Sequence, residues 1–371
     1  ADIISFAAGI PAPELFPAKE WSEITKEILT NNSKTALVYG VTEGYLPLRD
    51  LTKKRMEKAD VFNADTDELI ITSGAQQAID LTAKVLLNPG DAVIAENPSF
   101  IGSLNSFRSY GAKLYGAKIE DDGINTDDVE RLLKEHDNVK FIYTIPTFQN
   151  PSGTTMSLEK RKKLLELAEK YDVMILEDNP YGELRFNGKD VATLKSMDKT
   201  GRVIYAGTYS KTLAPGIRVG FLCAAKKIVD RVIVVKQVND VNTTVLSQMM
   251  VYEYITRYDF EAHIKKCCEV YKKRCDLMLS KMDEKFPKEC KYTRPDGGIF
   301  ILATMPEGCD TKKMLAEAIE NKVAFVPGNT FMHDMDAPSN MFRLNYSVTS
   351  EDAIIKGIDL LSEVVKKYAV K

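Results

Sequence analysis

The chain has 371 residues, of which 44% are hydrophobic and 28% are charged, a composition ordinary for a soluble globular protein. Its 50 Lys and Arg residues against 53 Asp and Glu residues give a net charge of −3, which offers no electrostatic basis for binding nucleic acid or an anionic membrane. The length exceeds what one hydrophobic core usually organises, so we expect one large and one small domain.

No apolar run approaches the roughly 18 residues of a transmembrane helix, and the N-terminus lacks the basic-then-apolar pattern of a signal peptide. The six cysteines form no Cys-x-x-Cys pair and the three histidines are scattered, so we expect no metal site. This cysteine usage favours a reducing compartment, and we predict a cytoplasmic protein.

Periodicity and turn residues predict the elements in chain order. Residues 1–20 are punctuated by prolines and are expected to wrap a surface, a short amphipathic helix follows at 21–29, and another opens at 44–49 and runs through Lys58. Strands are then expected at 69–72, 92–95, 113–117, 141–144, 173–176, 203–206 and 219–223, and helices at 75–87, 100–110, 127–136 and 157–171, the last with Ser157 as N-cap. This alternation predicts a mostly parallel sheet covered on both faces.

The pattern turns helical after Lys226 and stays so to about Phe286, with a segment at 258–285 long enough to bridge two domains. Beyond it, short strands (299–303, 324–326, 342–346) mix with helices (311–321, 351–367), which predicts a small α+β domain. We therefore expect an N-terminal segment and helix (1–38) packed on the small domain, a large domain (39–270) and a small C-terminal domain (271–371).

One lysine lies on a loop between two predicted strands, where open α/β sheets bind their ligands. Lys211 sits among small, hydroxyl and apolar residues in the segment 208–220. Desolvation lowers the pKa of an ammonium, and reaching the free amine at pH 7 from about 10.4 takes about 3 units, or roughly 4 kcal/mol. Proteins make this shift in nucleophilic lysines that form Schiff bases. The alternative is that Lys211 is one more solvated lysine.

The segment 210–220 (Ser-Lys-Thr-Leu-Ala-Pro-Gly-Ile-Arg-Val-Gly) resembles the cofactor-lysine segment of fold-type I aminotransferases of class I/II, which use pyridoxal 5'-phosphate (PLP). The resemblance runs from about Phe6 to Arg343 and is nearest the broad-specificity branch that handles 2-aminoadipate, kynurenine and aromatic or branched amino acids. It implies an α/β fold with a mostly parallel sheet of seven strands flanked by helices, a smaller α+β domain, PLP bound in the large domain, and a Schiff base on Lys211.

Three polar residues acquire roles around the cofactor ring from this resemblance. Asp178 would keep the pyridine nitrogen protonated, which makes the ring an electron sink. Tyr181 and Asn150 would donate to the phenolic oxygen, and Asn150 would also face the substrate. Read alone, Asp178 is equally a turn residue, Tyr181 a core tyrosine and Asn150 part of an Asn-Pro turn.

The turn Ser-Gly-Ala-Gln at 73–76 lies between a predicted strand and helix, where unpaired N–H groups can cradle a phosphate. Arg218 could grip the same anion with its planar fork of donors. The resemblance assigns cofactor contacts to Gly74, Ala75, Gln76, Phe100, Thr208, Ser210 and Arg218. Phe100 would stack on the ring; the alternative is a core phenylalanine at a helix start.

Arg343 stands inside an apolar predicted strand, which is unusual for an arginine. The resemblance assigns it a bidentate grip on the substrate α-carboxylate, with Gly9 nearby, whereas a buried structural ion pair is the alternative. The segments 6–17 and 331–338 are expected to shape the side-chain pocket. Tyr39 resembles the tyrosine that reaches the phosphate of the neighbouring subunit, which implies a homodimer with shared active sites.

Together these residues predict an aminotransferase that moves an amino group from an L-amino acid to a 2-oxo acid, with 2-oxoglutarate as the expected acceptor. A PLP-dependent C–S β-lyase needs the same lysine and electron sink, so it stays open. A ligand-sensing aminotransferase-like domain of a regulator is the third possibility. The chain leaves no room for a DNA-binding module before Phe6 and has no basic patch, which counts against it.

Overall fold

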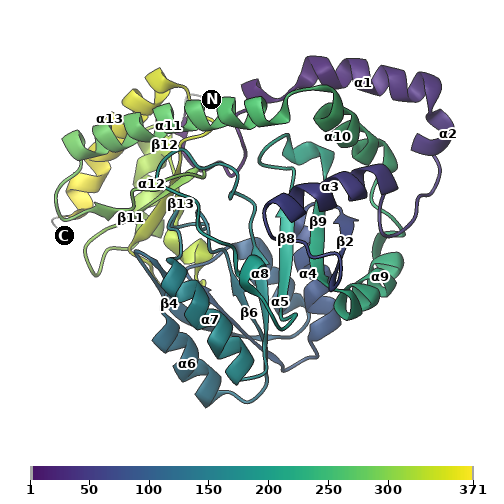
Figure 1. Ribbon diagram of the computed structural model, residues 1–371. Helices are drawn as coiled ribbons and strands as arrows, with labels where there is room; N and C mark the ends of the chain where they lie inside the picture. Colours follow the sequence, from purple (N-terminus) through teal and green to yellow (C-terminus); the bar gives the residue numbers. More distant parts are fainter. Residues whose placement is uncertain (1–2, 370–371) are drawn as a thin grey trace.

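The computed structural model describes residues 3–369, which form a large α/β lobe and a smaller C-terminal lobe (Figure 1). The large lobe is built on one sheet with the strand order β2-β9-β8-β7-β6-β3-β4-β5. Its strands are β2 (Asp67–Thr72), β3 (Ala92–Asn97), β4 (Lys113–Glu120), β5 (Gly123–Ile124), β6 (Val139–Thr144), β7 (Met174–Asp178), β8 (Val203–Thr208) and β9 (Gly220–Ala225). The predicted, mostly parallel sheet of seven strands is confirmed; the short β5 adds an eighth strand, antiparallel to β4.

The chain enters this sheet at β2 and returns to its side through β9, the one long strand that runs antiparallel to both neighbours. The strands β8, β7, β6, β3 and β4 pair in parallel. Their carboxyl ends therefore share one edge of the sheet, which is where ligands bind in open α/β folds.

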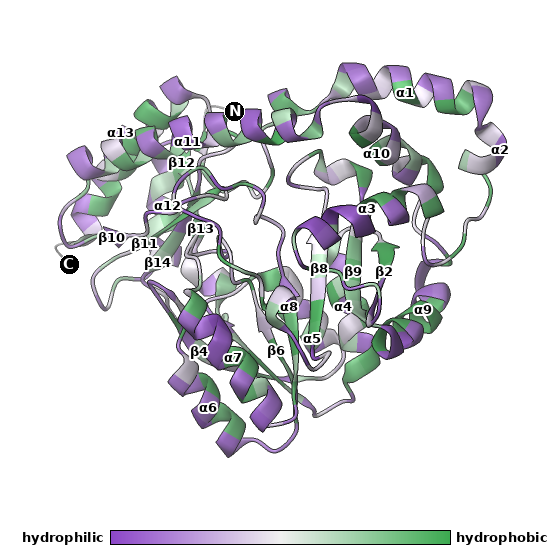
Figure 2. Cartoon of the chain, in the orientation of Figure 1, coloured by the Kyte–Doolittle hydropathy of each residue, from purple (hydrophilic) through white to green (hydrophobic). Residues whose placement is uncertain are grey.

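Helices cover both faces of the large sheet because its strands are apolar on both sides. On one face, α4 (Ala75–Leu86), α5 (Ile101–Ser109) and α9 (Lys226–Asp240) pack over residues such as Ile70 and Ile204. The other face is covered by α3 (Leu46–Lys58), α6 (Thr126–Glu135), α7 (Leu158–Lys170) and α10 (Val245–Arg257). Figure 2 shows hydrophobic strands (green) and mixed, amphipathic helices around them. The predicted N-cap is confirmed, since the Ser157 side chain accepts from the N–H of Lys160.

The C-terminal lobe has a sheet ordered β10-β11-β14-β13, covered by three helices. The elements are α11 (Phe260–Lys285), β10 (Lys291–Tyr292), β11 (Phe300–Thr304), α12 (Thr311–Glu320), β13 (Val326–Pro327), β14 (Met341–Asn345) and α13 (Glu351–Ala369). A separate parallel pair joins β1 (Ile4–Ser5) to β12 (Val323–Ala324). The remaining short elements are α2 (Ser33–Ala36), α8 (Leu194–Met197) and the 3-10 turns Pro13–Leu15, Pro215–Ile217 and Gly328–Phe331. The expected strand 324–326 is thus divided between β12 and β13.

The N-terminal segment divides between the two lobes. Phe6 belongs to the core of the C-terminal lobe. In contrast, α1 (Ala18–Asn31) buries Trp21, Ile24 and Ile28 in the core under β2 and β9, against α10. The prediction that this helix packs on the small domain is therefore wrong, because an amphipathic stripe shows that a face is buried but not against what.

The expected boundary between residues 270 and 271 falls inside α11. Phe260 and Ile264 at its start belong to the core of the large lobe, whereas Tyr271 and Met278 belong to the C-terminal core. We therefore propose that α11 itself is the rigid connection between the domains 39–270 and 271–371. None of the helices within residues 3–369 combines the length and apolar character needed to cross a bilayer.

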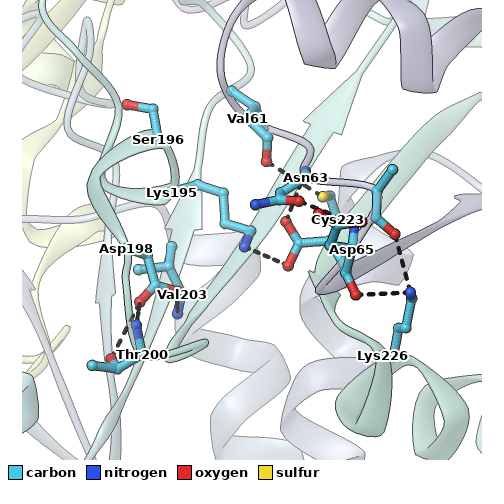
Figure 3. Close-up of polar contacts among 12 residues, drawn as sticks. Val61, Asn63, Asp65, Lys195, Ser196, Asp198, Thr200, Val203, Cys223 and Lys226 are labelled. Atoms are coloured by element: carbon cyan, nitrogen blue, oxygen red, sulfur yellow. Dashed lines mark hydrogen bonds and ion pairs between the residues drawn. The ribbon is translucent and has the colours of Figure 1, made fainter.

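A buried ion pair ties α8 to the first strand of the large sheet. The ammonium of Lys195 donates to Asp67 Oδ1 at 2.9 Å, and both side chains are only 4% exposed. Figure 3 shows Lys195 pointing toward the turn that carries Asn63 and Asp65. The other carboxylate oxygen of Asp67 accepts from the Asn63 N–H at 3.1 Å. The turn before β2 is thus held by the same carboxylate that neutralises the buried lysine.

Removing this carboxylate is expected to destabilise the fold strongly. In Asp67→Asn, the Lys195 ammonium stays buried without its anion, so we expect the free energy of unfolding to fall by about 3–5 kcal/mol. Urea denaturation followed by circular dichroism measures the change. The matched control is Asp276→Asn, which removes an exposed pair with Lys272 and should change stability by about 0.5 kcal/mol or less. Equal losses in the two variants would contradict the role given to the buried pair.

Candidate active site

The turns that follow β2, β3, β6, β7 and β8 converge on one cavity of about 400 Å³. The predicted residues that line it are Gly9, Ala75, Gln76, Phe100, Asn150, Asp178, Tyr181, Thr208, Ser210, Lys211, Arg218 and Arg343. Gly74 lies directly behind the lining, against the Arg218 side chain. Tyr39 is the predicted residue that is not brought into the cavity: it is 85% exposed on the surface.

The loop between β8 and β9 is fixed by its own backbone. The N–H of Tyr209 donates to the carbonyl of Val219 at 3.0 Å, and the Thr208 hydroxyl donates to that of Ser210 at 2.9 Å. Two polar hydroxyls are thereby held at the end of β8 together with Lys211. These hydrogen bonds constrain the start of the loop, which helps to fix the position of a functional side chain.

Lys211 is half-buried and points across the cavity. Its Nζ donates to the Gly9 carbonyl at 2.8 Å and lies 5.7 Å from the centre of the Tyr181 ring. Burial lowers the pKa of Lys211 to about 8, helped by the positive charge of Arg343 and opposed by Asp178. At pH 7 a pKa of about 8 leaves roughly a tenth of the Lys211 amine neutral, far more than a solvated surface lysine offers.

Asp178 ends β7 and is buried, with one carboxylate oxygen satisfied and one not. Its Oδ2 accepts from the Tyr143 hydroxyl at 2.7 Å, while Oδ1 has no hydrogen-bond partner among the described residues. Burial raises the pKa of Asp178 to about 7, against the lowering effects of Tyr143 and Lys211. Because buried polar atoms are normally hydrogen-bonded, Asp178 Oδ1 can accept from a donor group of a ligand bound in the cavity.

Arg343 on β14 is buried without a counter-ion. Its guanidinium donates to Asn150 Oδ1 at 2.9 Å and, more weakly, to the Ala7 carbonyl at 3.2 Å. The rings of Phe300 and Phe331 lie 4.0 and 4.9 Å from it. No carboxylate of residues 3–369 forms an ion pair with it, so the alternative of a structural ion pair is wrong. Burial lowers the pKa of Arg343 to about 10.

The first turn of α4 and Arg218 form an anion cradle. Gly74 has φ +78°, and a side chain there would overlap the Arg218 guanidinium. Arg218 is itself in the left-handed region (φ 53°), and its fork donates to the Ser73 carbonyl at 3.0 Å. A Cβ at Gly220 would lie 2.7 Å from the Gly74 carbonyl carbon, so only glycine lets β9 approach α4 this closely. The unpaired N–H groups of α4 and the guanidinium favour an anion such as a phosphate.

Sequence reasoning missed two buried residues that organise the site. Tyr143 holds Asp178, as described above. Glu96, at 1% exposure, accepts from Gln149 Nε2 at 3.1 Å, and the same amide donates to the Pro98 carbonyl at 2.9 Å. Glu96 thus links the turn before Phe100 to the turn that carries Asn150. No sequence signal marks either residue, because their partners lie 35 and 53 positions away in the chain.

A larger cavity of about 840 Å³ lies beside α3 and the segment 179–193. Arg55, which lines it, is already paired with Glu183 at 2.5 Å and Glu261 at 2.6 Å. The buried cations of the smaller cavity lack such partners, so the smaller cavity is the candidate active site. Within the described part of the chain, no group of three or more His, Cys, Asp or Glu side chains is arranged to hold a metal ion.

The sequence matches the family model "Aminotransferase class I and II" over residues 1–358, and the chain belongs to this family. It is 44% identical to aromatic-amino-acid aminotransferase 1 of Thermococcus litoralis, over 100% of this chain and 90% of the relative. It is 36% identical to 2-aminoadipate transaminase of Thermus thermophilus, over 98% of this chain and 90% of the relative. A crystal structure of kynurenine aminotransferase from Pyrococcus horikoshii superposes with a TM-score of 0.95 at 42% identity, over 99% of this chain and 91% of that one.

The protein is therefore an aminotransferase of fold type I, with PLP as its cofactor. The chemistry of the cavity fits this group. The unpartnered Oδ1 of Asp178 suits a ring N–H, the α4 cradle with Arg218 suits a phosphate, and Lys211 supplies an amine for an aldehyde.

The stability of the cofactor-free protein should fall with rising pH because of Asp178. Its folded-state pKa of about 7 lies above the ordinary value of 3.8, so the folded state holds this proton more tightly than the unfolded chain does. The stability that this group contributes is present below about pH 4 and is lost as the pH rises through about 7. Unfolding free energies at about pH 4.5 and 7.5 measure it.

In Asp178→Asn the loss of stability between these pH values should be smaller, although Glu96 and Glu177, whose pKa values burial also raises to about 7, still contribute. A variant whose stability falls as steeply as that of the wild type would contradict the raised pKa of Asp178.

Proposed function

We propose that Lys211, Asp178 and Arg343 carry amino transfer from an aromatic or other apolar L-amino acid to a 2-oxo acid. The observation that supports this most directly is the buried Arg343 guanidinium without a counter-ion, facing the same cavity as Lys211 and Asp178. A substrate α-carboxylate would supply the missing negative charge and two acceptor oxygens.

Each residue has one task in this proposal. When bound, PLP supplies an electron-withdrawing ring that stabilises negative charge at the substrate Cα. Asp178 would hold the ring nitrogen protonated through its free Oδ1, and Tyr181 and Asn150 would donate toward the phenolic oxygen. Arg343 orients the substrate by its carboxylate. The Lys211 amine, with its pKa lowered to about 8, accepts the Cα proton as general base.

The walls of the cavity support apolar donors. Ile79, Ile101, Val326 and Phe331 line it, and its three cations are Lys211, Arg218 and Arg343. The proposed roles occupy all three cations, and the four apolar residues favour a donor amino acid with an uncharged side chain. The likeness to an aromatic-amino-acid aminotransferase agrees with this choice. We keep 2-oxoglutarate as the proposed acceptor, and the free thiols of the described cysteines favour a reducing, cytoplasmic setting.

Lys211→Ala should abolish amino transfer from phenylalanine to 2-oxoglutarate, with a loss of at least about a hundredfold expected from removing a general base alone. Formation of phenylpyruvate measures the rate. Borohydride reduction followed by peptide mass spectrometry should find the cofactor on the peptide containing residue 211 in the wild type and not in the variant. Lys227→Ala, at an exposed position of α9, is the matched control and should behave like the wild type.

Retained turnover in Lys211→Ala would overturn the assignment. A C–S β-lyase is recognised in the same preparation by release of pyruvate and ammonia from an S-alkyl cysteine. If that rate exceeds transfer from every donor tested, the lyase is the correct function.

A homodimer with shared active sites is the second part of the proposal. Exposed apolar residues cluster in the segment 37–46 and at the end of α9: Leu37, Val38, Tyr39, Val41, Leu46, Val234, Val238 and Val241. A hydrogen bond from the Thr42 hydroxyl to the Val241 carbonyl at 2.7 Å joins the two segments into one surface. Such a contiguous apolar surface is typical of an interface between subunits. Tyr39 would then reach the cofactor phosphate of the neighbouring subunit.

Mixed dimers test whether Tyr39 acts on the neighbouring site. Tyr39→Ala should weaken PLP binding, and Lys211→Ala should be inactive. In a dimer with one subunit of each kind, one of the two sites receives both Tyr39 and Lys211, so about half of the wild-type activity should return. If Tyr39 acts within its own subunit, no site is complete and mixing restores nothing. Sedimentation should show a dimer in every preparation; a monomer would contradict the proposal.

A further inference from the structure

The chain makes an uncommon turn immediately after α9. Val241 has φ 63° and ψ −59°, and the N–H of Asn242 donates to the Asp240 carbonyl at 2.7 Å. This is a γ-turn with positive φ, a rare conformation, and it is occupied here by a β-branched residue that strongly disfavours it. Strained backbone of this kind persists where surrounding contacts hold it, and it marks segments that position something else.

Asp240 supplies the contacts that hold this turn. Its Oδ1 accepts from the ammonium of Lys236 at 2.7 Å, and Lys236 is a fully buried side chain. Its Oδ2 accepts from the Ser73 hydroxyl at 3.0 Å and from Gln77 Nε2 at 2.7 Å. The Asp240 carboxylate therefore neutralises a buried cation and also accepts hydrogen bonds from Ser73 and Gln77, on either side of the start of α4.

Ser73 connects Asp240 to the anion cradle through its backbone. Its carbonyl accepts from the Arg218 guanidinium at 3.0 Å, and its N–H donates to Gln77 Oε1 at 2.7 Å. The next residue is Gly74, whose peptide begins the first turn of α4. Asp240 does not line the cavity and does not contact Arg218, yet it holds Ser73, whose carbonyl accepts from the Arg218 guanidinium and which directly precedes the α4 N-terminus.

We infer that Asp240 is a positioning residue for the cofactor phosphate, acting through Ser73 on Arg218 and the first turn of α4. The inference rests on the proposed function of the cavity. The Val241 carbonyl of the same γ-turn accepts a hydrogen bond from the Thr42 hydroxyl at 2.7 Å. The turn therefore also joins the cradle to the segment 37–46.

A role limited to folding predicts a different pattern from a role in positioning. If Asp240 only stabilises the large lobe, its loss weakens every ligand of the cavity alike. If Asp240 positions the cradle, its loss weakens the binding of a ligand that carries a phosphate and leaves the binding of a ligand without a phosphate unchanged. PLP and pyridoxal differ only in this group, so the ratio of their affinities isolates the contribution of the cradle.

The experiment compares the full-length wild type with Asp240→Asn and Ser73→Ala. Each holoenzyme is stripped of cofactor and titrated with PLP and, separately, with pyridoxal, with the absorbance of the lysine-bound form as the signal. We expect the dissociation constant for PLP to rise by about tenfold or more in both variants, the size expected for losing a hydrogen bond to a charged group, with pyridoxal binding nearly unchanged. Because Ser73→Ala leaves the Lys236–Asp240 pair intact, it tests the link even if Asp240→Asn folds poorly.

Asp230→Asn is the matched control, since Asp230 lies on the exposed side of the same helix and should change neither titration. The effects of Asp240→Asn and Ser73→Ala should not add in the double variant, because both break the same hydrogen bond. An equal loss for PLP and pyridoxal, or no loss for either, overturns the inference. Failure of the wild type to bind PLP at all would instead overturn the proposed function.

Discussion

The structure depends on placing three ionisable groups in one small cavity without letting them neutralise one another. Asp178, Lys211 and Arg343 are each held by a neutral partner: the Tyr143 hydroxyl, the Gly9 carbonyl and the Asn150 amide oxygen. Burying charges in this way destabilises a folded protein, since desolvation is not offset by direct ion pairs. The compensation must come from a ligand that brings a cationic ring, an aldehyde and a carboxylate in the matching positions. The pKa values of the three groups are shifted mainly by burial, which reflects the same lack of compensating charges.

The fold meets this demand through the arrangement of its strands. The parallel strands place Phe100, Asn150, Asp178 and Lys211 at one edge of the sheet, because each residue ends a strand or follows one. The antiparallel β9 then brings the chain back beside β2, so that Arg218 reaches the turn that opens α4. The contact requires glycine at position 220, where two backbones meet without room for a side chain. A mostly parallel sheet with one reversed strand is thus a means of aiming one arginine at one helix end.

Sequence reasoning succeeded where a residue's chemistry is tied to a place along the chain. Lys211 between two apolar strands, Asp178 at a strand end and Arg343 inside an apolar strand were all assigned to one site, and the cavity contains all three. It failed where a residue acts through partners distant in sequence. Glu96 looks like an ordinary strand residue, and Asp240 looks like an ordinary helix terminus; their roles exist only in contacts to Gln149 and Ser73. The placement of α1 failed for the same reason, because its amphipathic pattern carries no information about which core it joins.

Arg343 and Lys211 belong to different lobes, and the N-terminal residues 7–9 contact both. The carbonyl of Gly9 holds Lys211, while that of Ala7 holds Arg343 at 3.2 Å. A substrate carboxylate forms shorter, charge-assisted bonds than this carbonyl does, so it would take over the guanidinium when it binds. Arg343 is also the second largest cause, after burial, of the lowered pKa of Lys211. A substrate carboxylate paired with Arg343 would therefore raise the pKa of the Lys211 amine. A higher pKa makes the free amine a stronger proton acceptor but leaves less of it unprotonated, so the charge on Arg343 would set the balance between the two.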